Sequence, residues 1–213
     1  MIKAVIFDID GTLSAKNSWT SLTKDLGGSV DEHLRIFKDF LEERANYKDS
    51  KEKLLKVWQK TGNANRQTFQ EIFEKWPLRE EAQEVVDFLK DKGLITCIIT
   101  GSMDLYAEVI AKRLGIPFYY ANTELIWDEE SNLADYHYFR DQAGKKLEQF
   151  NQLCQEQNLS LKECIIVGDD ENDIELFKIA RGIAFKSPDS KNIEPIAWKI
   201  ITNLSELKAV LSG

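Results

Sequence analysis

Four short, almost purely apolar runs constrain the fold of this chain more than any other feature. They are rich in Ile, Val and Phe and span residues 3–7, 94–99, 164–167 and 182–185. Because polar residues do not alternate with the apolar ones, each run predicts a strand that is buried on both faces. Strands of that kind belong to a parallel sheet that helices cover on both sides.

Helical patterns lie between these runs. Apolar residues repeat at helical spacing in residues 77–92, 103–114 and 149–157, and a glycine follows each of the first two segments. Strands that alternate with helices predict an α/β fold, with a Rossmann-like parallel sheet sandwiched by helices. Residues 119–138 form two partly alternating arms around a polar centre, which predicts a hairpin.

The segment after the first apolar run has a different character. Residues 18–76 contain helix-start signals and helical apolar spacing but no strand-like run. We therefore expect a small all-helical cap, residues 15–76, inserted after the first strand. The α/β core then comprises residues 1–14 and 77–213. A last strand and a short helix are expected near the end of the core.

Composition excludes several classes of protein. The 213 residues fit one domain with an inserted lobe. The formal charge of −8 opposes binding to nucleic acid or to anionic lipid, so a small molecule is the expected partner. No apolar stretch approaches the roughly 20 residues that a membrane-spanning helix needs. The sequence leaves open whether the protein is a monomer or a homodimer.

The first residues of the chain and its cysteines indicate the cellular compartment of the protein. Asp8 and Asp10 interrupt the first apolar run well short of the core of a secretory signal. The three cysteines are widely spaced and form no Cys-x-x-Cys pair, so they predict neither a disulfide framework nor a zinc site. A reducing cytoplasm is the expected compartment.

Polar clusters follow three of the predicted strands. They are Asp8 and Asp10 after the first run, Thr100, Gly101 and Ser102 after the second, and Asp169, Asp170 and Asp173 after the third. The carboxyl ends of parallel strands meet at one edge of a sheet, so these clusters can converge. Carboxylates gathered there repel one another unless a cation is present, and an all-oxygen set suits Mg²⁺. A phosphoryl substrate would also need a hydroxyl donor and a fixed cation, which Thr100 and a lysine can supply.

Several of these clusters resemble motifs of the haloacid dehalogenase superfamily, most of whose members are Mg²⁺-dependent phosphatases. Residues 7–13 read Phe-Asp-Ile-Asp-Gly-Thr-Leu and resemble the first motif. Residues 98–101 match the second motif, an apolar strand that ends in Thr or Ser, and residues 168–173 match the fourth, Gly-Asp-x-x-x-Asp. The third motif is a lysine ahead of a helix. Lys146 fits it best because apolar residues follow at helical spacing, and Lys145 is the alternative.

A helical insertion directly after the first motif resembles the phosphoserine-phosphatase-like branch of this superfamily. The resemblance implies that Asp8 is the nucleophile, forms an aspartyl-phosphate and binds Mg²⁺. It implies that Asp10 protonates the leaving group, activates water and lends its backbone carbonyl to the ion. By the same resemblance, Asp169 completes the protein ligands of the metal. Asn172 and Asp173 support the metal or the phosphate indirectly, through the residues that bind them.

The resemblance also assigns the phosphate site. Thr100 and the amide of Gly101 hold phosphoryl oxygens, and Lys146 offsets the negative charge between Asp8 and the phosphate. The expected function is Mg²⁺-dependent hydrolysis of a small phosphorylated metabolite. A phosphomutase or phosphotransferase of the same fold, an inactive binding module and a receiver-like signalling module are the alternatives. In receivers, the acidic pair precedes a separate acceptor aspartate, whereas here residues 8–10 carry acceptor and acid together.

The substrate is expected to differ from phosphoserine. Phosphoserine phosphatases carry a Glu shortly after the first motif for the substrate ammonium and an Arg in the cap for its carboxylate. Those positions fall at Asn17 and Leu54, although Arg44 or Arg66 can stand in for the Arg. Unpaired substrate charges are costly to bury. Asn17 and Trp19 therefore favour a neutral polar or ring-bearing leaving group, with Trp19 as a stacking face.

Overall fold

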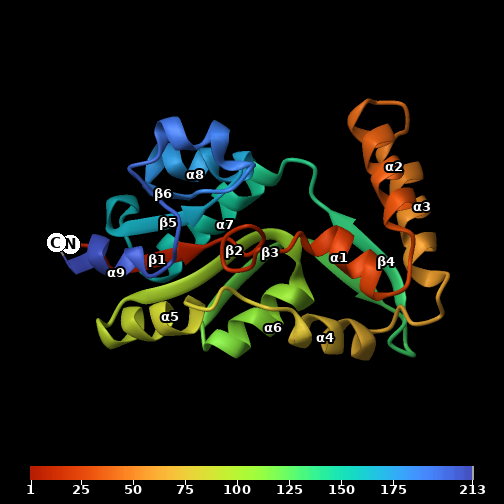
Figure 1. The fold of residues 1–213 in the computed structure, drawn as a ribbon, viewed down its shortest axis with the longest axis horizontal. Helices are drawn as coiled ribbons and strands as arrows, with labels where there is room; N and C mark the ends of the chain where they lie inside the picture. Colours follow the sequence, from red (N-terminus) through yellow and green to blue (C-terminus); the bar gives the residue numbers. More distant parts are fainter. Residues whose placement is uncertain (213) are drawn as a thin grey trace.

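The computed structural model describes residues 1–212, which form a seven-stranded sheet between two layers of helices, with a helical lobe at one end (Figure 1). The strand order is β4-β3-β2-β1-β5-β6-β7. β3 and β4 pair antiparallel, and the other neighbours pair parallel. The strands are β1 Ala4–Phe7, β2 Ile95–Met103, β3 Phe118–Trp127, β4 Leu133–Tyr138, β5 Cys164–Gly168, β6 Arg181–Phe185 and β7 Lys199–Ile201.

Successive residues of β1 face opposite sides of the sheet, and both sides are buried. Val5 and Phe7 belong to a core that includes apolar side chains of α5, α6 and α9. Ala4 and Ile6 belong to a second core with α7 and α8. These helices are α5 Ala82–Asp91, α6 Asp104–Leu114, α7 Gln142–Glu156, α8 Ile174–Ile179 and α9 Glu206–Ser212. The predicted α/β fold with a helix-covered parallel sheet is confirmed.

Four helices and no strand occupy the segment that follows the first motif, in agreement with the predicted helical insertion. They are α1 Ser18–Asp25, α2 Val30–Leu41, α3 Tyr47–Gln59 and α4 Arg66–Lys75. An Asn or Ser side chain begins each of them by accepting a hydrogen bond from a backbone N–H in the first turn. The exact limits of a cap domain remain a prediction.

Aromatic side chains join this lobe to the rest of the molecule. The ring of Trp58 in α3 lies 5.4 Å from that of Tyr136 in β4, measured between centroids. Phe73 in α4 lies 5.1 Å from Tyr106 in α6. The backbone N–H of Leu133 also donates a hydrogen bond to the carbonyl oxygen of Ala64 in the lobe. The β3–β4 hairpin therefore forms one wall of the lobe, a contact that the sequence pattern did not predict.

Two predicted element boundaries were wrong in a way that matters for the site. α7 begins at Gln142, seven residues before the predicted start, because the Asp141 side chain caps it by accepting from the N–H of Gly144. Lys146 therefore lies within the helix instead of ahead of it. β2 runs on through Thr100 to Met103, with a shift in its pairing to β3 after Thr100.

Shorter 3₁₀ turns complete the chain at Leu161–Glu163, Glu171–Asp173, Ser190–Asn192 and Glu194–Ile196. Within residues 1–212, none of the helices combines the length and the apolar character needed to cross a membrane.

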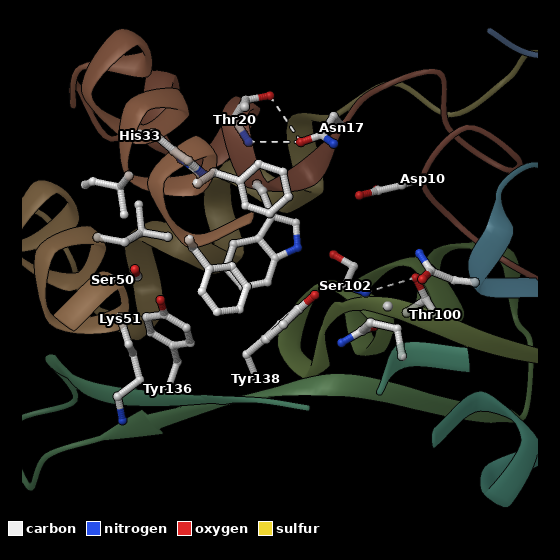
Figure 2. Close-up of a pocket in the computed structure, with 18 of the residues that line it drawn as sticks. Asp10, Asn17, Thr20, His33, Ser50, Lys51, Thr100, Ser102, Tyr136 and Tyr138 are labelled. Atoms are coloured by element: carbon white, nitrogen blue, oxygen red, sulfur yellow. Dashed lines mark hydrogen bonds between the residues drawn. The ribbon is translucent and has the colours of Figure 1, made fainter. Parts of the chain in front are cut away.

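A buried histidine lies in the lobe, beside the cavity shown in Figure 2. His33 of α2 is 4% exposed, and its Nδ1 lies 2.6 Å from the Thr23 hydroxyl oxygen. That oxygen also accepts a hydrogen bond of 2.7 Å from the Trp58 indole. Burial lowers the pKa of His33 from 6.5 to about 4, so the ring is neutral near pH 7.

This shift predicts a pH dependence of stability. Below pH 6.5 the unfolded chain binds a proton at His33, whereas the folded chain binds it only near pH 4, so acidification destabilises the fold. The contribution is at most about 1.4 kcal/mol per pH unit in that window. Urea unfolding of wild type and His33→Gln at pH 7 and pH 5 should show a smaller pH effect in the variant. A stability difference between the two proteins that is the same at both pH values would contradict the prediction.

Candidate active site

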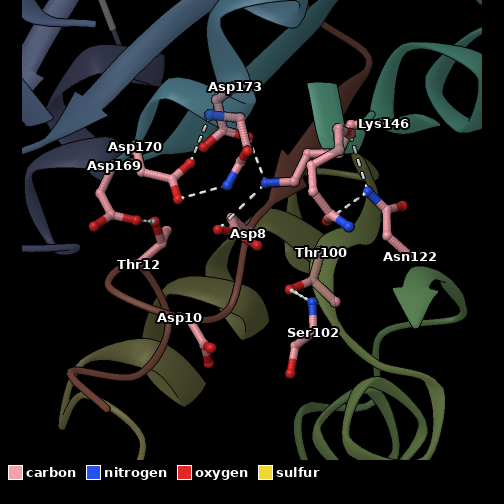
Figure 3. A network of polar contacts seen from close by, with 12 residues as sticks. Asp8, Asp10, Thr12, Thr100, Ser102, Asn122, Lys146, Asp169, Asp170 and Asp173 are labelled. Atoms are coloured by element: carbon pink, nitrogen blue, oxygen red, sulfur yellow. Dashed lines mark hydrogen bonds and ion pairs between the residues drawn. The ribbon is translucent and has the colours of Figure 1, made fainter. Parts of the chain in front are cut away.

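The predicted polar clusters converge at the carboxyl edge of the sheet (Figure 3). Phe7, the last residue of β1, pairs with Ile98 in β2 and with Val167 in β5. Asp8, which comes directly after β1, therefore lies between Thr100 of β2 and Asp169, which comes directly after β5. The three short apolar strands are in register, and this register brings residues more than 150 positions apart in the chain to one edge.

Lys146 is the one lysine of the adjacent pair that reaches this edge. Its ammonium lies 2.8 Å from an Asp173 oxygen and 3.3 Å from an Asp8 oxygen, and its side chain is 1% exposed. Burial lowers the pKa of Lys146, but the negative charges of Asp173 and Asp8 raise it by more, so the ammonium stays charged. Lys145 points to the surface and pairs with Glu148.

Asp173 lies behind this ammonium in the 3₁₀ turn after β5. A Cβ atom at Gly168 would lie 2.0 Å from an Asp173 oxygen, so only glycine leaves room for this carboxylate. Burial raises the pKa of Asp173 to about 7, although Lys146 acts in the opposite direction. Burial likewise raises the pKa of Asp8 above its ordinary value, against the effect of Lys146.

Asp10 has a separate set of partners. One of its oxygens accepts hydrogen bonds from the backbone N–H and the hydroxyl of Ser18, at 2.9 and 2.5 Å. The hydroxyl of Ser18 lies 2.6 Å from that of Ser102 in β2. Burial raises the pKa of Asp10 to about 7, and the Ser18 hydrogen bonds lower it in part. The sequence did not reveal this bridge, because Ser18 and Ser102 carry no motif of their own.

Asp169 packs against the turn that follows Asp10. Thr12 donates a hydrogen bond of 3.3 Å to it, and a Cβ atom at Gly11 would lie 1.9 Å from one of its oxygens. Gly11 has a φ of +76°, a conformation that also favours glycine. Burial and the charge of Asp8 raise the pKa of Asp169 to about 8.

Arg79 fixes this turn from outside. Its guanidinium donates to the carbonyl oxygens of Gly11 and Thr12, each at 2.7 Å. Arg79 lies more than sixty residues beyond the turn in the sequence, and no local pattern identifies it. Sequence reasoning therefore missed this residue, which only the folded chain brings to the motif.

The closest acidic cluster differs from the predicted metal set. Carboxylate oxygens of Asp8, Asp170 and Asp173 lie within 4.8 Å of one another, whereas Asp169 is outside this cluster. Asp170 is half-buried. Both Asp170 oxygens accept hydrogen bonds from Asn172, at 2.9 Å from its backbone N–H and 2.8 Å from its side-chain amide. Asn172 therefore orients Asp170, and its predicted support of the metal or the phosphate remains a prediction.

The donors at this edge fit a hard cation such as Mg²⁺. One oxygen each of Asp8, Asp10 and Asp173 is buried without a hydrogen-bond partner among the described residues. Asp8 and Asp173 share the ammonium of Lys146, and the carboxyl groups of Asp10 and Asp169 lie at the same edge, so the acidic groups outnumber this cation. These acidic groups offer only oxygen atoms. Mg²⁺ prefers such a set and would relieve the repulsion.

The second predicted motif lines the same site from β2. The hydroxyl oxygen of Thr100 accepts a hydrogen bond of 3.2 Å from the N–H of Ser102. A Cβ atom at Gly101 would lie 2.7 Å from the Gln142 side-chain oxygen. Thr100, Gly101 and Lys146 all line one cavity together with Asp8, as their predicted roles around a phosphate require.

That cavity has a volume of about 340 Å³ and extends from the acidic edge into the lobe (Figure 2). Asn17 and Trp19 both line it, as the substrate prediction requires. Asn17 also caps α1 by accepting from the N–H of Thr20. The Trp19 ring packs between aromatic neighbours, at 5.8 Å from Trp58 and 5.9 Å from Tyr136. The tyrosines of β4 that complete this wall were not predicted.

Comparison with known proteins identifies the family. The family model described as "Hydrolase: haloacid dehalogenase-like hydrolase" matches residues 2–181. The chain is a haloacid dehalogenase-like hydrolase. The predicted family is therefore confirmed, as is the prediction that the chain is a hydrolytic enzyme.

Relatives of this hydrolase with more specific names belong to the phosphoserine-phosphatase-like branch. A phosphoserine phosphatase of Methanocaldococcus jannaschii is 24% identical over 181 residues, which cover 84% of this chain and 82% of that protein. The structure of a substrate-bound phosphoserine phosphatase complex has a TM-score of 0.76 at 22% identity, covering 99% and 98% of the two chains. A probable phosphoserine phosphatase of Vibrio cholerae has a TM-score of 0.80 at 17% identity, covering all of this hydrolase and 64% of that chain.

Proposed function

We propose that this hydrolase removes phosphate from a small phosphorylated metabolite, with Mg²⁺ as cofactor and an aspartyl-phosphate on Asp8 as intermediate. The observation that carries the proposal is the environment of Asp8. One Asp8 oxygen pairs with the buried ammonium of Lys146, while the other is buried with no hydrogen-bond partner among the described residues. A carboxylate held this way keeps a lone pair for attack on phosphorus.

The first step forms a bond between an Asp8 oxygen and phosphorus as the bond from phosphorus to the substrate alcohol breaks. The departing oxygen takes a proton, and Asp10 is the donor in this proposal. Its pKa of about 7 allows it to carry that proton near neutral pH, and Ser18 fixes its orientation. In the second step, water attacks phosphorus, Asp10 accepts the water proton, and the bond to Asp8 breaks to release phosphate.

The phosphoryl group is held by the predicted phosphate site. Thr100 and the amide of Gly101 bind its oxygens, and Lys146 balances negative charge that builds up beside Asp8. Asp173 keeps the Lys146 ammonium in place through the 2.8 Å ion pair, which makes it a positioning residue.

Asp8, the backbone carbonyl of Asp10 and Asp169 would hold the ion. Asp169 is preferred to Asp170 because both Asp170 oxygens already accept hydrogen bonds from Asn172. Asp169 has a pKa raised to about 8 by burial and by the charge of Asp8, so its carboxylate gains from a nearby cation. When bound, Mg²⁺ supplies charge that polarises a phosphoryl oxygen.

A phosphomutase or phosphotransferase would use the same residues and differ only in the acceptor of the second step. The family match disfavours a receiver-like module, because the haloacid dehalogenase-like model covers residues 2–181. Release of inorganic phosphate distinguishes hydrolysis from transfer to a second alcohol.

Asp8→Asn tests the nucleophile. An amide is a poor nucleophile and carries no charge, so we expect phosphate release to fall by about a thousandfold or more. The assay is phosphate release from a panel of phosphomonoesters with Mg²⁺, followed by mass spectrometry for a phosphorylated protein. Persisting turnover in the purified variant would remove Asp8 from the proposed role.

Removal of the metal with EDTA should abolish turnover, and excess Mg²⁺ should restore it. Asp169→Asn should raise the Mg²⁺ concentration for half-maximal activity by at least about tenfold. Asp170→Asn is the matched control, since both oxygens of this neighbouring carboxylate already accept hydrogen bonds from Asn172, and we expect a smaller change. If Asp170→Asn has the larger effect, the metal assignment moves to the Asp8, Asp170 and Asp173 cluster.

Asp10→Asn should impair proton transfer more than metal binding. Loss of a general acid typically costs about 10² to 10⁴ in rate. The leaving groups of aryl phosphates need little protonation. The single-turnover rate of Asp8 phosphorylation should therefore fall less for aryl phosphates than for alkyl phosphates. An equal loss for both substrate types would exclude Asp10 as the acid of the first step.

A further inference from the structure

The cavity has two chemically different ends. The end at the sheet edge contains the charged residues around Asp8 and Lys146. We call the lobe end the apolar chamber; it is lined by Trp19, Leu34, Phe37, Phe40, Leu54 and Tyr136. Because the two ends are continuous, a phosphate bound beside Asp8 directs the alcohol part of the substrate into the chamber.

The described residues that line the chamber offer no free ionic partner. Lys51 pairs with Asp135 at 2.8 Å, and Figure 2 shows its nitrogen pointing away from the aromatic cluster. His33 is neutral near pH 7. Arg140 lies 5.1 Å from the centre of the Phe40 ring but is exposed and does not line the cavity.

The cations that could have replaced a missing cap arginine are also engaged elsewhere. Arg44 pairs with Asp39 and Glu42 on the surface. Arg66 pairs with Glu108 at 3.5 Å, also on the surface. Neither residue lines the cavity. A substrate carboxylate would therefore find no such cation in the chamber, and Asn17, which also lines the cavity, offers a substrate ammonium no charge.

The chamber does offer hydrogen bonds and apolar surface. The hydroxyl oxygen of Ser50 is buried and has no partner among the described residues, and Figure 2 shows Ser50 at the opposite end of the cavity from Asp10. Leu34 and Phe37 line the cavity from α2 and are 49% and 47% exposed. An apolar group in the chamber would cover these two side chains and gain from their removal from water.

We infer that the substrate of this hydrolase is the phosphate ester of an uncharged, largely apolar alcohol, with its ring or chain held in the apolar chamber. The inference rests on the proposed phosphatase function and deepens it. Trp19 gives a face for ring contact because Trp58 and Tyr136 hold its indole in position. Phe37, a half-exposed lining residue, favours an apolar alcohol part.

Benzyl phosphate and L-phosphoserine provide the test, because both are esters of primary alcohols and differ in the charge of the alcohol part. We expect kcat/KM with Mg²⁺ to be at least about tenfold higher for benzyl phosphate. Phe37→Ser should lower kcat/KM for benzyl phosphate about fivefold, mainly by raising KM. The same variant should change kcat/KM for phosphoserine less. Leu41→Ser is the matched control: Leu41 lies on the same helix, is 62% exposed and does not line the cavity.

The outcomes separate this inference from the proposed function. Equal or better turnover of phosphoserine, or equal effects of Phe37→Ser and Leu41→Ser, would overturn the apolar chamber and leave a phosphatase. Acetyl phosphate is small and reactive, so its hydrolysis reports phosphoryl transfer that does not depend on the chamber. Failure of the enzyme to hydrolyse acetyl phosphate would count against the proposed function. Calorimetric titration of Asp8→Asn protein and Mg²⁺ with both esters repeats the comparison without turnover. Tighter binding of benzyl phosphate supports the inference, and equal binding contradicts it.

Discussion

One buried ammonium balances the carboxyl edge of this sheet. Lys146 is 1% exposed and lies between Asp8 and Asp173, in surroundings where an unpaired charge would be very costly. Removing either partner would leave a buried charge uncompensated. The early start of α7, the missing side chain at Gly168 and the register of β1 against β5 all serve this contact. The remaining carboxylates exceed what one ammonium can neutralise, and this excess makes the edge suited to a divalent cation.

Ring contacts join the lobe to the rest of the molecule, alongside the ion pairs of Lys51 with Asp135 and of Arg66 with Glu108. Its helices meet the β4 strand and α6 in edge-on and tilted aromatic contacts, of which Trp58 with Tyr136 and Phe73 with Tyr106 are examples. Aromatic pairs bury a large area with little loss of side-chain entropy, which suits a small segment with few other core residues. The same contacts shape the apolar chamber. The stability of the lobe and the selectivity of the cavity therefore depend on overlapping residues.

The separation of charged and apolar ends also divides the chemistry. In the proposed function, the charged end handles the phosphate, because Asp8, Asp10 and Lys146 lie at the sheet edge. In our proposal, selection among substrates falls to the lobe, where uncharged Asn17 and Leu54 occupy the positions of the ionic contacts that a zwitterionic substrate would need. The proposed arrangement would let a haloacid dehalogenase-like hydrolase share the fold of phosphoserine phosphatases and still prefer a different substrate.

The sequence by itself determined the α/β sheet, the helical insertion, the family and the positions of Asp8, Thr100 and Lys146 along the chain. Those features rest on local periodicity and on short motifs, which a single segment carries. Only the tertiary structure decided that Ser18, itself in contact with Ser102, holds Asp10, that Arg79 fixes the Gly11 turn and that β4 lines the chamber. It also decided that carboxylate oxygens of Asp8, Asp170 and Asp173 lie within 4.8 Å of one another. Some of these contacts join residues that are distant in sequence, and others depend on the rotamer of a side chain. Neither kind of contact leaves a periodic signal in the sequence.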